Sequence, residues 1–330
     1  MKIRILKPGL LSTVQDMGRK NYLSDAVPFS GVMDQLSAQI ANIAVGNDPG
    51  CAVSEFTQSG ASFKVEEDIV LAWSGEGAYL SSGGRHLPSG RPVFVPAGAE
   101  IYLEHNPDGF RSYVAVAGGW DAPEVLGSRS TYIPAGIGGI NGRALLEDDE
   151  LNSSPALSPL SRQIVESLAG EGINYPNWQI AVGAFLPVDR CTIRVIPGKE
   201  FDWFDDASKQ HIFTGKIAVA NNSSRMGYRL QGAKMSRVRW DEMLSTAVVP
   251  GTVQVAGDGE LILLMADAQT TGGYPRIAQV ASVDMPLCAQ LKPGDELSFC
   301  RISLKDAERL YLKQVADLDK ARTGVKQKYS

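Results

Sequence analysis

The chain has 330 residues, 44% of them hydrophobic; this apolar content excludes a disordered chain, and the length predicts two domains. Its 34 glycines and 18 prolines exceed average usage, which excludes a long-helix bundle and favours short strands joined by turns. The formal net charge is −5 and the body of the chain has no basic stripe, which excludes nucleic acid as a partner.

The first elements predicted along the chain are a strand and a helix. Residues 1–6 alternate in polarity and predict a short strand that a Pro-Gly pair ends, without the apolar core of a signal peptide. Residues 33–45 carry apolar side chains at helical spacing, with Ser30 or Asp34 as the N-cap, and predict a helix. No apolar run approaches about 18 residues, so we expect no membrane span and a cytoplasmic protein.

Short segments rich in β-branched or aliphatic residues follow the helix, and Gly, Pro, Asn or Asp separates nearly all of them. We predict that the following segments are strands: Ile69–Trp73, Ile101–Glu104, Ser112–Ala117, Thr192–Ile196, Ile217–Ala220, Thr252–Ala256, Glu260–Met265, Ala278–Val283 and Leu297–Ile302. This layout is typical of barrels or sandwiches, so the predicted fold is mainly β with few helices.

The middle of the chain predicts a domain boundary. Residues 152–161 are polar and broken by prolines, and the residues up to 186 carry little strand signal, although a short helix fits near Ile164–Leu168. We therefore predict an N-terminal β domain over residues 1–186 that ends in a linker over residues 152–186. A second β domain is predicted over residues 187–302.

The C-terminal segment, residues 303–330, predicts a helix and a tail. Ser303 and Asp306 resemble a capping box with Asp in place of Glu, and an apolar stripe follows them. The basic residues between 320 and 328 are interpreted as a solvated tail.

Histidine and cysteine are too scattered for metal or nucleophilic chemistry. The three histidines do not have zinc-site spacing, so we predict no metal site: His86, His105 and His211. The four cysteines form no C-x-x-C pair, so we predict buried thiols: Cys51, Cys191, Cys288 and Cys300. No G-x-S-x-G motif and no P-loop occur. The glycine run over residues 136–143 follows a proline and leaves no room for a helix, so it is interpreted as a turn rather than a dinucleotide loop.

The segment from Met265 to Pro275 is the most unusual polar stretch. It follows an apolar strand and offers an amide, two hydroxyls, two glycine N–H groups and a phenol: Gln269, Thr270, Thr271, Gly272, Gly273 and Tyr274. Such groups suit the recognition of a carbonyl, a carboxylate or an amide. A β-turn whose side chains satisfy their own backbone accounts for the same residues equally well.

A second cluster, residues 221–230, contains Arg225 and Arg229 on either side of a glycine. In a helical turn, both guanidinium groups would face one side and could clamp an anion. Pairing of each arginine with a surface carboxylate is the commoner arrangement.

A third cluster near the N-terminus is rich in turns and short-range polar groups. Gln15, Asp16, Arg19 and Asp34 could line a cleft at the entry to the first helix. They could equally hold the N-terminal strand in place, and this structural interpretation is the simpler one.

Taken together, the three clusters resemble one known family. The motifs that carry the resemblance are Thr13-Val-Gln-Asp16, Gly18-Arg19, Ser30-Gly-Val-Met33-Asp34, Arg225-Met-Gly-Tyr-Arg-Leu230 and Gln269-Thr-Thr-Gly-Gly-Tyr-Pro275. They resemble the KipA-type family, also called allophanate hydrolase subunit 2 or biotin-dependent carboxyltransferase-like, from about Ile3 to Ile302. Ser54-Glu55-Phe56 and Pro197-Gly198-Lys199 depart from the family pattern.

The resemblance implies a fold, partners and a reaction. It implies two cyclophilin-like β-barrel domains and a partner of the KipI type, which is the B-subunit of such systems. In the ATP-dependent opening of 5-oxoproline to glutamate, an A-subunit also takes part. This chain has no P-loop, and which chain of the complex binds ATP is left open.

Two other functions fit the same family. Relatives form part of the carboxyltransferase region of urea carboxylase, where carboxybiotin is the donor. This chain lacks the Met-Lys-Met of a biotin-attachment site, so biotin would come from another chain. The third function is non-enzymatic, as a regulator of a KipI-type inhibitor of a sensor kinase.

For lactam opening, the three clusters receive expected roles. Arg225 and Arg229 would stabilise a substrate carboxylate or a phosphate. The segment Gln269–Gly273 would hold the carbonyl, with Tyr274 beside it. The N-terminal cluster would form the opposite wall of the site: Gln15, Asp16, Arg19 and Asp34.

Overall fold

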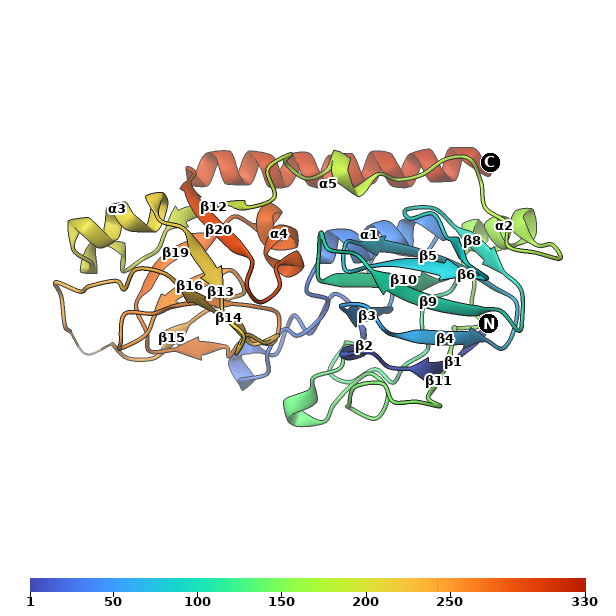
Figure 1. Ribbon diagram of the computed structural model, residues 1–330, viewed down its shortest axis with the longest axis horizontal. Coiled ribbons are helices and arrows are strands. Elements are labelled where there is room, and N and C mark those ends of the chain that lie inside the picture. The colour runs from blue at the N-terminus through green and yellow to red at the C-terminus, as the bar shows by residue number, and fades with distance from the viewer. Residues whose placement is uncertain (242) are drawn as a thin grey trace. The chain divides into compact units, whose positions relative to one another are not determined.

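The structure is a computed structural model that describes residues 1–241 and 243–330 (Figure 1). The chain forms two compact units. The first unit contains residues Met1–Gly18, Asp34–Phe185 and Val315–Ser330, and the second contains Arg19–Met33 and Leu186–Gln314. The division after Phe185 lies beside the domain boundary predicted near residue 186, but each unit also takes a segment from the other end of the chain.

The first unit is built from two antiparallel sheets. The six-stranded sheet has the order β11-β1-β4-β9-β6-β7, and the five-stranded sheet has the order β2-β3-β10-β5-β8. The strands are β1 (Lys2–Lys7), β2 (Leu11–Gln15), β3 (Val53–Thr57), β4 (Ser62–Val65), β5 (Ile69–Gly75), β6 (Ala78–Ser82), β7 (Arg85–His86), β8 (Val93–Val95), β9 (Glu100–His105), β10 (Arg111–Val116) and β11 (Glu150–Asn152). Alternate side chains of both sheets meet in one core, which includes Ile5, Phe63, Phe56 and Trp73.

Helix α1 (Gln35–Ala44) packs on β10 and β5, on the face of the five-stranded sheet that points away from this core. Asp34 is its N-cap, as predicted, because its side chain accepts a hydrogen bond from the Ser37 backbone N–H at 2.9 Å. The other elements of the unit are helix α2 (Pro159–Leu168) and two short 3₁₀ helices, η2 (Ile133–Ala135) and η3 (Val182–Ala184).

The second unit is a closed seven-stranded barrel with the order β12-β19-β16-β17-β14-β13-β20. Its strands are β12 (Thr192–Pro197), β13 (Ile217–Val219), β14 (Gly227–Gln231), β16 (Thr252–Val255), β17 (Leu261–Leu264), β19 (Arg276–Val280) and β20 (Glu296–Arg301), and β15 (Thr246–Ala247) pairs with β18 (Thr271–Gly272) outside the barrel. Its helices are α3 (Asp206–Thr214), α4 (Met285–Gln290), η1 (Leu23–Asp25), η4 (Phe201–Trp203) and η5 (Ser282–Asp284). The barrel is filled by side chains such as Phe299, Tyr228 and Leu263.

The prediction of a mainly β chain with few helices is therefore confirmed, and three local predictions need correction. The basic residues 320–328 are not a tail, because α5 (Leu304–Lys328) continues through them and Val325 is buried. The predicted linker is interrupted at Pro159, where α2 begins behind a Ser158 cap. The predicted strand Ala278–Val283 ends at Val280, since the chain then turns through η5 into α4.

The prediction of buried thiols is correct for one cysteine and wrong for Cys191. Cys288 on α4 is fully buried in the core of the second unit, where burial raises the pKa of its thiol far above the ordinary value. Cys191 is exposed because it lies in the loop that precedes β12, and Cys51 and Cys300 are half-buried. On β20, Phe299 points into the core, so the next residue, Cys300, points away from it.

Among the described residues, none of the helices combines the length and the apolar character that a membrane crossing requires.

An ion pair near the start of the barrel fastens the loop after β12 to β19. Arg276 donates from Nε and from a terminal guanidinium nitrogen to the Glu200 carboxylate, at 2.7 Å each, and Glu200 is 5% exposed. Burial raises the pKa of Glu200, but the hydrogen bonds from Arg276 outweigh this effect and hold that pKa below its ordinary value. The pair therefore stabilises the fold at neutral pH.

We expect Glu200→Gln to lower the free energy of unfolding by about 2–3 kcal/mol at neutral pH, because Arg276 loses a charged partner in a largely buried site. The folded-state pKa of Glu200 is depressed, so its contribution is fully present above the unfolded pKa of about 4.3 and is lost as pH falls through the folded value. Urea unfolding of both proteins between about pH 7 and pH 3 should show the difference shrinking with acid.

The matched control is Glu296→Gln, which removes an exposed partner 3.2 Å from Lys216. It should cost less than about 1 kcal/mol. Equal losses in the two variants, or a difference that grows in acid, would contradict the role given to Glu200.

Candidate functional site

A hollow on the barrel of the second unit brings two of the predicted clusters together. β14 pairs with β17 in antiparallel register, with Arg229 opposite Ile262, so the second cluster lies beside the strand that leads into Gln269. The hollow has a volume of about 200 Å³, and its lining includes six polar side chains: Asn222, Ser224, Arg229, Gln254, Gln269 and Tyr274. Arg229, Gln269 and Tyr274 were predicted from the sequence, and Gln254 was not.

Gln254 lines the hollow and is 1% exposed. Its side-chain Nε2 donates to the Tyr274 carbonyl oxygen at 3.4 Å. A Cβ on Gly272 would lie 2.5 Å from that same nitrogen, so a side chain at this position would displace the Gln254 carboxamide. Thr271 and Gly272 form β18, so pairing with β15 holds the backbone of this segment in place.

Arg229 and Arg225 do not share a face in the way that a helical turn would require, because residues 227–231 form a strand. Arg229 is 46% exposed and lies 3.8 Å from Glu260. Arg225 is buried and donates to both oxygens of Asp267, at 2.9 Å and 3.1 Å. Of the two arginines, Arg229 alone lines the hollow.

The Arg225–Asp267 pair also binds the N-terminal segment of the second unit. The Ser30 hydroxyl donates to Asp267 at 2.9 Å, and a terminal nitrogen of Arg225 donates to the Gly31 carbonyl oxygen at 2.5 Å. Arg19 belongs to the same unit, where its side chain is fully buried and its backbone N–H donates to the Phe29 carbonyl at 2.7 Å. Arg225 and Asp267 therefore hold the segment around Ser30 and Gly31 in place.

The remaining residues of the N-terminal cluster lie in the first unit and have structural partners. Asp16 accepts hydrogen bonds from the hydroxyls of Ser128 and Ser130, both at 2.5 Å, and from the Arg129 backbone N–H at 2.6 Å. It ties the end of β2 to that loop. Asp34 caps α1, as described above, and the expectation that these residues wall a cleft stays a prediction.

A row of buried polar side chains on the five-stranded sheet escaped the sequence analysis. Thr13, Glu55, Tyr113 and Ser74 lie opposite one another across β2, β3, β10 and β5. Glu55 is 1% exposed, with one oxygen 4.0 Å from Arg111 Nε. A glutamate inside an otherwise buried strand was the signal available in the sequence.

Tyr113 and Ser74 of this row, and Gln15 beside it on β2, are in unusual environments. Burial, followed by the carboxylates of Glu55 and Asp34, raises the pKa of Tyr113 well above its ordinary value. Ser74 Oγ and Gln15 Oε1 are buried and have no hydrogen-bond partner among the described residues. The hydrogen-bonding capacity of these two atoms is therefore unused among the described residues.

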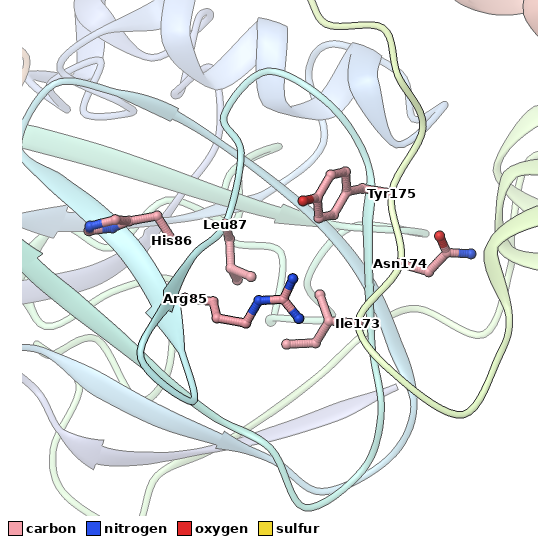
Figure 2. Close-up of a pocket in the computed structure, with 6 residues that line it drawn as sticks. All are labelled: Arg85, His86, Leu87, Ile173, Asn174 and Tyr175. Carbon is pink, nitrogen blue, oxygen red and sulfur yellow. The ribbon is translucent and has the colours of Figure 1, made fainter.

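A second hollow, of about 160 Å³, lies at the β7 hairpin of the first unit and is lined by Leu87, Ile173, Asn174 and Tyr175 together with Arg85 and His86. Figure 2 shows the Arg85 guanidinium beside Ile173, while His86 points away from it. Within residues 1–241 and 243–330, no group of three or more His, Cys, Asp or Glu side chains is arranged to hold a metal ion.

Comparison with known proteins identifies the family. A model of the carboxyltransferase domain, subdomain A and B, matches residues 25–301. The chain belongs to this family. The resemblance described from the sequence motifs is therefore confirmed.

Two relatives that are named as the C-subunit of 5-oxoprolinase match nearly from end to end. The protein from Escherichia coli is 35% identical over 95% of this chain and 97% of its own length, and the one from Haemophilus influenzae is 33% identical over 99% of each. The solved urea carboxylase from Kluyveromyces lactis superposes with a TM-score of 0.86 at 28% identity, over 98% of this chain. This chain spans only 29% of that much longer protein.

We expect Asp267→Asn to lower the free energy of unfolding by about 3 kcal/mol, because the Arg225 guanidinium stays buried without a charged partner. Thermal or urea unfolding measures the loss. Glu260→Gln is the control, because Glu260 is 40% exposed and its contact with Arg229 is long, at 3.8 Å. This variant should change stability by less than about 1 kcal/mol. If both variants unfold like the wild type, Asp267 does not hold this segment.

Proposed function

We propose that this chain is the C-subunit of an ATP-dependent 5-oxoprolinase, which opens 5-oxo-L-proline to L-glutamate together with a KipI-type B-subunit and an A-subunit. The observation that carries the proposal is the near end-to-end match to two proteins named as this component of 5-oxoprolinase, which covers 97% and 99% of their lengths. We assign the complex to the cytoplasm, in line with the sequence analysis.

The hollow on the barrel suits a cyclic amide that carries a carboxylate. Arg229 is the one charged side chain among its described lining residues, and it pairs with the substrate carboxylate. The carboxamide of Gln269 donates to the lactam carbonyl oxygen at the rim. Gln254 holds the backbone at Tyr274 in place through its hydrogen bond to the Tyr274 carbonyl oxygen.

Opening a lactam requires that the amide carbonyl be activated and that the ring nitrogen leave. With ATP bound in the complex, the lactam carbonyl oxygen would take the γ-phosphoryl group and ADP would leave. Water would then add to the carbon, the C–N bond would break as the ring nitrogen takes up a proton, and a second water would release phosphate from the resulting acyl phosphate. This chain has no P-loop, so we assign it no nucleotide-binding residue. Its own residues position the substrate and stabilise the charge that develops on the carbonyl oxygen.

The other predicted residues have supporting roles in this proposal. Arg225 positions the segment around Ser30 through Asp267 and does not touch the substrate. Thr270, Thr271 and Gly273 shape the backbone that presents Gln269. Arg225 and Thr270 are assigned this role because they are buried, at 6% and 8% exposed. Thr271 and Gly273 are exposed, as Gln269 is, but they do not line the hollow.

The test uses the chain co-expressed with its partner proteins and measures ATP-dependent release of glutamate from 5-oxoproline. Arg229→Met and Gln269→Leu should each lower kcat/KM at least about tenfold, because each removes a contact to the substrate. Lys216→Met, on an exposed lysine in the loop that leads into β13, is the control and should change it less than about twofold. Turnover within twofold of wild type in both hollow variants would place the site elsewhere.

A second candidate function is carboxyl transfer in a urea carboxylase system. The TM-score of 0.86 to urea carboxylase favours it, and the chain would then receive a carboxyl group from biotin carried on another chain. Carboxyl transfer from carboxybiotin to urea, without ATP-dependent glutamate release by the complex, would support this function and overturn the first. If neither activity is found while a KipI-type partner binds, the chain is a non-enzymatic regulator.

A further inference from the structure

A third cavity, larger than the hollow on the barrel, lies within the first unit under the C-terminal end of α5. It has a volume of about 500 Å³, in the range of small-molecule sites. Three segments line it: Ile43–Asp48 at the end of α1, Ser158–Leu160 at the start of α2, and Arg322–Lys326 of α5. Figure 1 shows α1, α2 and the red C-terminal turns of α5. The proposed amide chemistry uses none of these residues.

The walls of this cavity are built from close packing. Gly46 has a φ of +76°, and a Cβ there would lie 2.8 Å from the Ser161 backbone nitrogen and 2.9 Å from Leu160 Cγ. The Ser158 hydroxyl donates to the Gly46 carbonyl oxygen at 2.8 Å. The end of α1 and the start of α2 are thus locked together, so this side of the cavity is preformed.

Positive charge gathers around an apolar interior. Arg322 and Lys326 are one helical turn apart on α5, so both reach the cavity from the same face. Lys326 has no ion-pair partner among the described residues, and Arg322 makes only a 3.9 Å contact with the exposed Asp48. The start of α2 adds the positive end of a ten-residue helix. Ile43, Pro159 and Leu160 supply the apolar surface.

We propose that this cavity binds a small amphipathic anion, namely a carboxylate, sulfonate or phosphate ester attached to an apolar group. The anionic group pairs with Arg322 and Lys326, and the apolar group packs on Ile43 and Leu160. The cavity lining carries two cations and one carboxylate, whereas the whole chain has a net charge of −5. This local excess of positive charge makes the cavity selective for anions.

The probe is 8-anilinonaphthalene-1-sulfonate, compared with N-phenyl-1-naphthylamine, which has the same rings without the sulfonate. Both are titrated by fluorescence against the full chain. The double variant Arg322→Gln/Lys326→Gln should weaken binding of the sulfonate about five- to tenfold and change binding of the neutral probe less than about twofold. Thr323→Phe, which fills the cavity from α5, should weaken binding of both probes, and octanoate should displace the sulfonate from the wild type.

The control is Arg309→Gln/Lys320→Gln, which removes two cations from the same helix that pair with acids three residues earlier, Asp306 and Asp317. It should leave both affinities within about twofold of the wild type. Circular dichroism verifies that each variant is folded. The proposal is overturned if the sulfonate binds the cavity variants as tightly as the wild type, or if the control loses as much affinity as the double variant.

Discussion

The arrangement of the second unit depends on one buried ion pair, between Arg225 and Asp267. Arg225 stands just before β14 and Asp267 just after β17, so the pair closes the end of a strand pair whose register places Arg229 opposite Ile262. Because a buried guanidinium without its carboxylate is costly, this end of the barrel has little freedom to slip. The residues that line the hollow follow directly from that closure: Arg229 continues the first strand, and Gln269 lies two residues beyond Asp267.

Several carboxylates in this chain anchor loops or a helix end. Asp16 holds the loop at Ser128–Ser130, Asp34 caps α1, and Asp284, fully buried, accepts from the backbone and side chain of Arg194. Acids committed to such bonds are poor general bases, since their lone pairs are already occupied. The polar groups that line the hollow are amides, one guanidinium, one hydroxyl and one phenol, with no carboxylate or imidazole among the described lining residues. This set suits charge stabilisation better than proton transfer.

Elements with a strong local signal were predictable. Two helix caps show this: Asp34 stands before a helical apolar pattern, and Ser303 stands three residues before Asp306. Their hydrogen bonds form within one helical turn, so the local sequence is enough to predict them. The pairing of Arg225 with Asp267, 42 residues away, and the placement of Gln254 under Tyr274 depend on strand register, which a single sequence does not specify. The helical geometry considered for Arg225 and Arg229 failed for the same reason, because pairing with β17 makes this segment a strand.

The chain's family includes relatives named for 5-oxoproline and for urea, and the solved urea carboxylase has the same fold, so the barrel by itself does not select the substrate. Both compounds present a carbonyl flanked by nitrogen, which amide side chains such as Gln269 can recognise in either case. They differ in charge, since 5-oxoproline carries a carboxylate and urea does not. In the function proposed above, selection between them comes from a cation that reaches the bound molecule. Among the described lining residues of the hollow that cation is Arg229, whose exposed contact with Glu260 at 3.8 Å is weak enough to be exchanged for a substrate carboxylate.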